Sequence, residues 1–200
     1  MSPASLFRFS GFAAILSGLF LIVDTLVIEL FLPETALTNT VGYSGLVIGV
    51  FALIGVYFFQ RTKGGYFGDI SFMVNFLGLL LIVGVMFFIN YIRPFLSQEA
   101  LQALLAGPTR AVLLVSAQTF LLGVLLFGIS IFRAGVFPRL AAVLYIVGFV
   151  IFSLEPLLPD AIVRTAQVLG SISVIWFGYT LLSTTQAISV AQLARSQAGY

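Results

Sequence analysis

Long apolar runs separated by short charged segments dominate the chain. Six runs reach or approach the length of about 20 mostly apolar residues that a helix needs to cross a bilayer. They lie at Phe9–Phe31, Ser44–Phe59, Ile70–Tyr91, Ala111–Phe132, Leu140–Leu154 and Ala161–Leu182. The fifth run is short, but the charged residues that flank it can extend toward the membrane surfaces. The pattern predicts an all-α polytopic membrane protein, with residues 1–200 forming a single domain of six transmembrane helices.

The first run has one feature of a signal peptide, because Arg8 precedes it. Its apolar region continues well beyond the roughly 7–15 residues usual for such a peptide, and no A-x-A cleavage site follows it. We therefore expect a retained helix.

The segment between the third and fourth runs is predicted to form a short amphipathic helix over residues 98–106. Ser97 is suited to cap its N-terminus, and Gly107 is suited to end it. Leu101, Leu104 and Leu105 share one face, so we expect the helix to lie flat at the outer membrane interface. An interfacial spacer is favoured over a lid.

The Lys and Arg residues are unevenly divided between the two sides, and this bias predicts orientation. With the N-terminus inside, the cytoplasmic side holds Arg8, Arg61, Lys63, Arg133, Arg139 and Arg195, and the outer side holds Arg93, Arg110 and Arg164. Five acids also fall on the outer side, namely Glu29, Glu34, Glu99, Glu155 and Asp160. We expect both termini to be cytoplasmic and the protein to lie in the cell (cytoplasmic) membrane.

Composition narrows the possible chemistry. Hydrophobic residues make up 60% of the chain and charged residues 8%, whereas soluble domains carry about 25% charged residues. Disordered, coiled-coil and nucleic-acid-binding proteins are excluded on this basis. The chain has neither His nor Cys, which excludes disulfides, iron–sulfur clusters, and imidazole or thiolate ligands and catalysts. We expect no cofactor, no metal site and no catalytic residue.

Asp24 is the most informative polar residue, because a carboxylate deep in a transmembrane helix is costly unless it is paired or hydrated. Its predicted partners are Arg110 and Arg164, at the outer starts of two helices. Gln118 and Gln167 sit at similar depths. The first, fourth and sixth helices could therefore enclose a polar vestibule that opens outward and binds a ligand. A structural ion pair without a ligand is slightly favoured over such a binding site.

Two further polar or aromatic residues lie within the apolar runs. Asn75 favours a hydrogen bond between helices. Trp176 lies in mid-span and should face the bundle, either as a pocket wall or as simple packing.

Two short segments each match part of a known functional motif. Thr40-Val41-Gly42-Tyr43 matches part of a potassium-channel filter, but Ser44 replaces the final glycine, and chance is favoured. Gly68-Asp69 matches part of an intramembrane aspartyl protease motif, but Asp24 lies at the opposite depth. Asp69 is interpreted as an N-cap instead.

Small residues recur at helical spacing in three of the runs: Ser10, Ala14 and Gly18 in the first, Gly45 and Gly49 in the second, and Ala166 and Gly170 in the last. Such stripes allow helices to approach closely. Packing within the monomer is the simpler interpretation, and a homodimer is the alternative.

Arg8-Phe-Ser-Gly11, followed by Ala14 and Gly18, and the turn from Phe132 to Leu140 resemble segments of a family of small six-helix bacterial membrane proteins filed as a domain of unknown function. The resemblance implies six helices in a bacterial cytoplasmic membrane, and no activity.

Taken together, these features predict a non-enzymatic membrane protein. It would be an accessory or structural subunit that packs with the bilayer and other membrane subunits, or a protein that binds a lipid-like or small ligand through Asp24, Arg110, Gln118, Arg164, Gln167 and Trp176. A small secondary transporter that uses Asp24 as its coupling or substrate-binding carboxylate is the alternative.

Overall fold

The computed structural model describes residues 3–33 and 35–198, with side chains for 3–33, 35–155 and 157–186. Its α-helices are α1 (Pro3–Val23), α2 (Glu29–Phe31), α3 (Ala36–Phe87), α4 (Gln98–Ala106), α5 (Thr109–Ala134), α6 (Arg139–Ser153) and α7 (Asp160–Ala198). Two π-helical turns, η1 (Asp24–Ile28) and η2 (Phe88–Ile92), and two 3₁₀ turns, η3 (Arg93–Phe95) and η4 (Glu155–Leu157), complete the elements. The part of the chain so described contains no strand, so the all-α prediction is confirmed.

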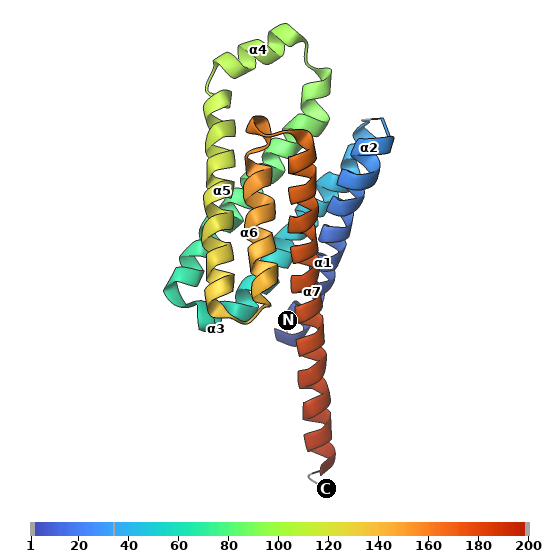
Figure 1. Cartoon of the computed structure of the whole chain (residues 1–200), viewed down its shortest axis with the longest axis vertical. Coiled ribbons are helices and arrows are strands. Elements are labelled where there is room, and N and C mark those ends of the chain that lie inside the picture. Colours follow the sequence, from blue (N-terminus) through green and yellow to red (C-terminus); the bar gives the residue numbers. More distant parts are fainter. Residues whose placement is uncertain (1–2, 34, 199–200) are drawn as a thin grey trace.

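Helix α3 is a hairpin of two helical arms, residues 36–64 and 66–87 (Figure 1). The chain reverses at Gly65, whose φ of 55° and ψ of −160° lie outside the helical region and in a region that glycine adopts readily. The arms run antiparallel, because the Tyr57 ring stacks on Phe72 at 4.0 Å and Tyr43 meets Tyr91 edge-on at 5.4 Å. These arms match the second and third predicted runs.

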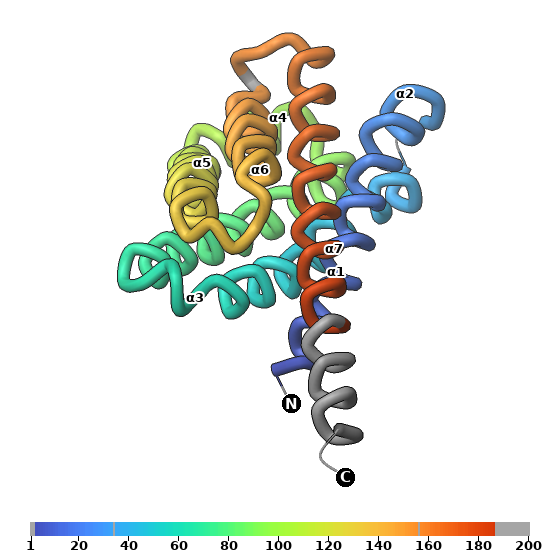
Figure 2. The backbone as a smooth tube through the Cα atoms, turned by 60° about the horizontal axis from the view of Figure 1, so that its bottom comes forward, coloured from blue at the N-terminus to red at the C-terminus, as the bar shows by residue number. Residues whose placement is uncertain are grey.

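The helical segments form a ring in which sequence neighbours are spatial neighbours. Helix α1 packs on α3, α3 on α5, α5 on α6, and α6 on α7. Helix α7 packs back on α1 and closes the ring (Figure 2). The bundle has two ends (Figure 1). At the Gly65 end, α3 reverses and α5 connects to α6. At the cavity end lie α2, η2 and η4.

Within the described residues, four helical stretches are long and apolar enough to cross a membrane: Pro3–Phe31, Ala36–Phe95, Thr109–Ala134 and Asp160–Gln186. Helix α6 is apolar but shorter. Large apolar side chains project from the outside of the bundle, including Phe12 (65% exposed), Met73 (68%) and Val115 (61%). An apolar exterior of this extent suits lipid and does not suit water. The helices therefore indicate a membrane protein.

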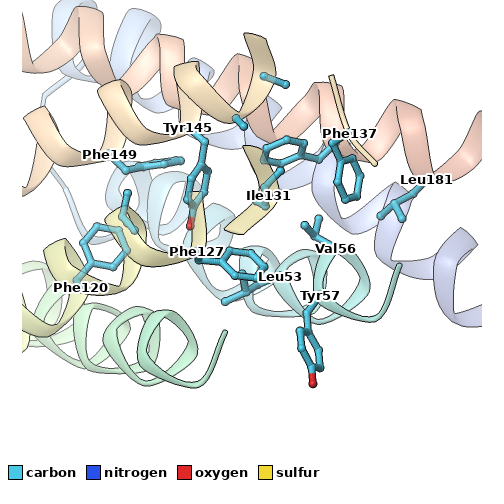
Figure 3. Packing of buried hydrophobic residues seen from close by; sticks show 14 of the residues in the cluster. Leu53, Val56, Tyr57, Phe120, Phe127, Ile131, Phe137, Tyr145, Phe149 and Leu181 are labelled. Carbon is cyan, nitrogen blue, oxygen red and sulfur yellow. The ribbon is translucent and has the colours of Figure 1, made fainter. Parts of the chain in front are cut away.

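An aromatic cluster fills the interior toward the Gly65 end. Phe127, Tyr145 and Phe149 are its central rings, and Phe137 and Phe177 meet edge-on at 5.1 Å beside them (Figure 3). Trp176 is partly buried and packs against this cluster, as expected for a residue facing the bundle.

The small-residue stripes pack inside the chain. A Cβ at Gly18 would lie 2.7 Å from the Ser171 carbonyl of α7. One at Gly148 would lie 2.4 Å from the Gly170 backbone nitrogen, so α6 and α7 touch through their backbones. These contacts match the prediction of packing within the monomer.

The short helix between the third and fourth runs is confirmed as α4, which crosses the cavity end between η3 and α5 (Figure 1). The Ser97 hydroxyl accepts a hydrogen bond from the Ala100 amide as predicted, and Gly107 follows the last turn. Of the charges used to predict orientation, Glu34 and the Arg195 side chain lie outside the described residues.

Candidate functional site

A polar cavity of about 440 Å³ opens at the cavity end of the bundle. Both α1 and α7 contribute to its wall, as do the two ends of the α3 hairpin and the α6–α7 connection. Its polar and charged lining residues are Asp24, Glu29, Asn39, Tyr43, Asn90, Arg93, Glu155, Asp160, Arg164 and Gln167. Ligand pockets of small molecules are typically about 300–1,000 Å³, so this volume is within their range.

Asp24 stands where α1 changes from α-helix to the π turn η1. The amide of Glu29 donates to the Asp24 carbonyl, five residues back, so one extra residue is accommodated in this turn. The Asp24 carboxylate lies directly against the Cα of Gly42 on α3, and any side chain at position 42 would overlap it. Asp24 makes no ion pair with the cations whose side chains the structure describes. π turns are often found at functional sites.

The second π turn, η2, faces the same cavity. Ile89 and Asn90 from η2 line it, as do Asp24 and Ile28 from η1. The Arg93 amide donates to the Phe88 carbonyl across this turn. Two of the long apolar helical stretches therefore carry the same local departure from α-helical geometry at the place where the bundle opens.

Arg164 pairs with acids other than Asp24. Its Nε lies 3.4 Å from Glu29 Oε2, and its Nη2 lies 3.6 Å from Asp160 Oδ2. The prediction that Arg164 or Arg110 partners Asp24 is therefore wrong. The Glu29 contact links α2 to α7 at the rim, where ion pairs contribute at most about 1 kcal/mol each.

Gln167 is the most buried polar side chain of the cavity wall, with 8% of its surface exposed. Its carboxamide makes no hydrogen bond to any side chain or backbone group that the structure describes. A polar group of a ligand or an ordered water in the cavity can therefore hydrogen-bond to this carboxamide.

Glu155 lies in η4, at the rim between α6 and α7. Partial desolvation raises the pKa of its carboxyl group above the ordinary value, and repulsion from the Asp160 carboxylate adds to the rise. The rim therefore accumulates negative charge that the chain does not fully compensate.

Three predicted site residues lie elsewhere. Arg110 and Gln118 on α5 are exposed and do not line the cavity. Trp176 packs on the aromatic cluster and lines neither cavity described here. Asp24, Arg164 and Gln167 are brought together at one cavity. The expectation that the fourth predicted helix, α5, forms a wall is wrong, because α3 separates it from α1 in the ring.

A second, apolar cavity of about 60 Å³ lies deeper in the bundle. Ser17 on α1, Gly49 on α3 and Tyr145 on α6 contribute to its lining. Leu21 and Leu46 line both cavities, so these two side chains stand between the polar cavity and the apolar one.

The structure also shows the contacts of Asn75 and Asp69 and the conformation of the Thr40–Tyr43 segment. Asn75 Nδ2 donates to the Tyr145 hydroxyl at 2.7 Å, which confirms a hydrogen bond between helices. The Thr40–Tyr43 segment is helical within α3 and cannot form an extended filter. Asp69 is not an N-cap, because the second arm begins at Tyr66. Its carboxylate instead accepts from the Tyr57 hydroxyl at 2.8 Å and lies 3.9 Å from Arg61.

Sequence reasoning missed Asn39, Tyr43 and Asn90 as cavity residues. Their only signal is position: they lie near the start of the second run and the end of the third run, which an antiparallel hairpin brings to one end of the bundle.

No cluster of three or more acidic side chains that could hold a metal ion occurs among the residues the structure describes. The comparisons give no relative: no family model, no curated protein and no solved structure matches the chain.

Proposed function

We propose that the protein crosses the cytoplasmic membrane six times, with each arm of α3 and the shorter α6 counted as crossings. Both termini are then cytoplasmic, and the polar cavity faces outward. Arg61, Lys63, Arg133 and Arg139 gather around the two connections at the Gly65 end, which supports this orientation through the positive-inside rule. A bacterial origin follows from the resemblance to small six-helix bacterial proteins.

The absence of native Cys in the sequence makes this topology directly testable. Single cysteines at Lys63 and Gln98 place a thiol at each end of the bundle. In intact cells, a membrane-impermeant maleimide should label the Gln98→Cys variant and should label Lys63→Cys only after permeabilisation. The reverse pattern would invert the proposed orientation.

Within this topology, we propose that the protein is a non-enzymatic membrane protein that binds a small polar ligand in its outer cavity. The single observation that carries the proposal is the 440 Å³ cavity, which holds Asp24 without an ion pair and Gln167 without a hydrogen-bond partner. Burying such groups is unfavourable, and a ligand that contacts both offsets that cost.

Native mass spectrometry on protein extracted gently from its own membrane tests this function. A stoichiometric small molecule that is retained by the natural chain and lost in Asp24→Asn supports it. Asp69→Asn is the matched control, because that carboxylate lies at the Gly65 end. A bare monomer, or a chain that arrives with another polypeptide, would instead favour an accessory subunit.

Transport is a second function, favoured by one observation. The polar cavity and the apolar cavity share Leu21 and Leu46, so a movement of these side chains would join them into one path. Under this proposal, Asp24 is the substrate-binding or coupling carboxylate. Proteoliposome uptake that depends on a proton gradient and is lost in Asp24→Asn supports transport. Uptake unchanged by Leu21→Ala and Leu46→Ala would remove the proposed path, and Leu37→Ala at an exposed position is their control.

A further inference from the structure

The charges around the polar cavity do not balance. Four acids line it (Asp24, Glu29, Glu155 and Asp160) against two arginines (Arg93 and Arg164), a formal excess of two negative charges when all are ionised. Arg164 is already engaged by Glu29 and Asp160 at 3.4 and 3.6 Å. Arg93 is exposed at the rim. The negative charges of Asp24 and Glu155 are thus in excess of the positive charges that line the cavity.

An acidic lining alone identifies no ligand, but the cavity also contains a built polar contact. Gln167 as a whole residue is more than nine-tenths buried and lines the same cavity, and its carboxamide has no hydrogen-bond partner within the described part of the chain. Asp24, in η1, lies against the Cα of Gly42. Both groups are therefore available to a molecule inside the cavity.

An aromatic ring completes the site. Tyr43 lines the cavity one residue after Gly42, and its ring is held by Tyr91 at 5.4 Å and by Phe87 at 6.1 Å. The face of an aromatic ring attracts a cation, and the attraction is larger where water is excluded. A ring fixed on two sides also loses little conformational entropy when a ligand binds.

The size and ligand set argue for an organic cation over a metal ion. Ca²⁺ and Mg²⁺ need about six to eight oxygen ligands at roughly 2.0–2.6 Å. A cavity of about 440 Å³ is far wider than such a shell, and the described residues provide no cluster of three carboxylates.

We propose that the ligand of the outer cavity is a small organic cation, such as an amine or a quaternary ammonium compound. Its positive centre is recognised by the Asp24 carboxylate and the Tyr43 ring, and its polar groups are recognised by Gln167. This inference rests on the proposed function, that the cavity binds a ligand at all.

Three probes of nearly the same shape but different charge test the inference: tetramethylammonium, neutral 2,2-dimethylpropan-1-ol and the trimethylacetate anion. Thermal unfolding and calorimetric titration of the purified full chain in nanodiscs are measured at matched ionic strength, with sodium chloride as the reference. Tetramethylammonium should raise the Tm and bind at one site, at least tenfold more tightly than either other probe.

Variants of the binding groups locate the effect. Asp24→Asn should weaken tetramethylammonium binding at least tenfold, whereas Glu99→Gln on α4, outside the cavity, should leave it unchanged. If Asp24→Asn does not fold, Tyr43→Leu against Tyr43→Phe separates loss of the ring from loss of the hydroxyl. Binding should fall severalfold in Tyr43→Leu and stay close to normal in Tyr43→Phe.

The experiments distinguish failure of the organic-cation inference from failure of the proposal that the cavity binds a ligand. Equal or tighter binding of the alcohol or the anion overturns the cation inference and leaves ligand binding in place. Absence of binding by all three probes also overturns it, and native mass spectrometry then decides separately whether the cavity holds another ligand. Tetramethylammonium binding that Asp24→Asn and Tyr43→Leu both leave unchanged places the cation elsewhere and overturns the site.

Discussion

The cavity end and the middle of the bundle are built from the same six helical segments in opposite ways. In the middle, small residues bring backbones into direct contact, as at Gly148 and Gly170. The aromatic cluster fills most of the remaining space, leaving a cavity of only about 60 Å³. At the cavity end, two π turns interrupt the helices, polar side chains line the wall, and about 440 Å³ stays open.

The middle of the bundle stabilises the fold, and the cavity end is available for binding. In a bilayer, helices associate through close packing and interhelical hydrogen bonds, because lipid is as apolar as the core. The middle of the bundle supplies those contacts. The cavity end can therefore contain Asp24 without an ion pair and Gln167 without a hydrogen-bond partner, because the packing elsewhere stabilises the fold.

The largest expected effect is at the α6–α7 contact. Gly148→Ala places a methyl group against the Gly170 backbone, which cannot move aside as a side chain could. We expect a loss of about 3 kcal/mol in the free energy of unfolding, the upper part of the range for overpacking. Reversible unfolding in mixed detergent micelles measures it.

The control for this change is Gly84→Ala. A Cβ at Gly84 on α3 meets nothing within 4 Å, and alanine favours a helix by up to about 1 kcal/mol over glycine. Stability should therefore stay constant or rise. Equal losses in both variants would show that backbone contact does not stabilise the middle of the bundle.

A smaller loss is expected from the buried hydrogen bond within the same region. Tyr145→Phe removes the hydroxyl that accepts from Asn75 Nδ2 at 2.7 Å, and the amide is left unsatisfied. The free energy of unfolding should fall by about 1–2 kcal/mol. The double variant Asn75→Leu with Tyr145→Phe should recover part of this loss, because both polar partners are replaced. Additive losses in the same unfolding assay would contradict a direct interaction.

A change at the cavity end should act on binding and hardly on stability. Gly42→Ala would place a methyl group on the Asp24 carboxylate, so that side chain must move. We expect tetramethylammonium affinity to fall about fivefold, equivalent to about 1 kcal/mol. The Tm without ligand should change little. Calorimetric titration measures the affinity, with Gly84→Ala again as the control. A large loss of Tm without any change in affinity would reverse the assignment of the two regions.

The smallest expected effect is a pH dependence from the rim. The pKa of Glu155 is raised in the folded chain by partial desolvation and by Asp160. The folded state therefore holds this proton more tightly than the unfolded state. Stability should be highest below the ordinary carboxyl pKa and should fall as pH rises from there through the raised pKa. Glu155→Gln should flatten this slope in Tm measured against pH, and Glu99→Gln should not.

Hydropathy predicted where the helical segments lie along the chain better than which face of each helix points into the bundle. The apolar runs, the α4 helix and its Ser97 cap follow from local sequence, and the structure contains them. The face that each helix turns inward does not follow in the same way, because lipid-facing residues are as apolar as buried ones. Asp24 and Gln167, which were expected at similar depths, do share a cavity.

Helix α5 shows the difficulty most clearly. Gln118 was assigned to the vestibule from its depth alone, and residues two apart, such as Ser116 and Gln118, are about 200° apart around a helix. Ser116 is buried and Gln118 is exposed. The π turns were not predicted either, because they depend on how α1 and α3 pack against their neighbours. The partner of Arg164 depends on the order of helices in the ring, which a single sequence does not contain.

The ring order has a consequence for how the protein is made. Each segment after α1 can pack against the one synthesised just before it, which is a favourable local contact during chain growth. The contact between α1 and α7 is different, because it must wait for the last helix to emerge. Asp24 comes from α1 and Gln167 from α7, so the cavity is assembled only at this final step. Until then, the growing chain carries a carboxylate in the membrane without the wall that will enclose it.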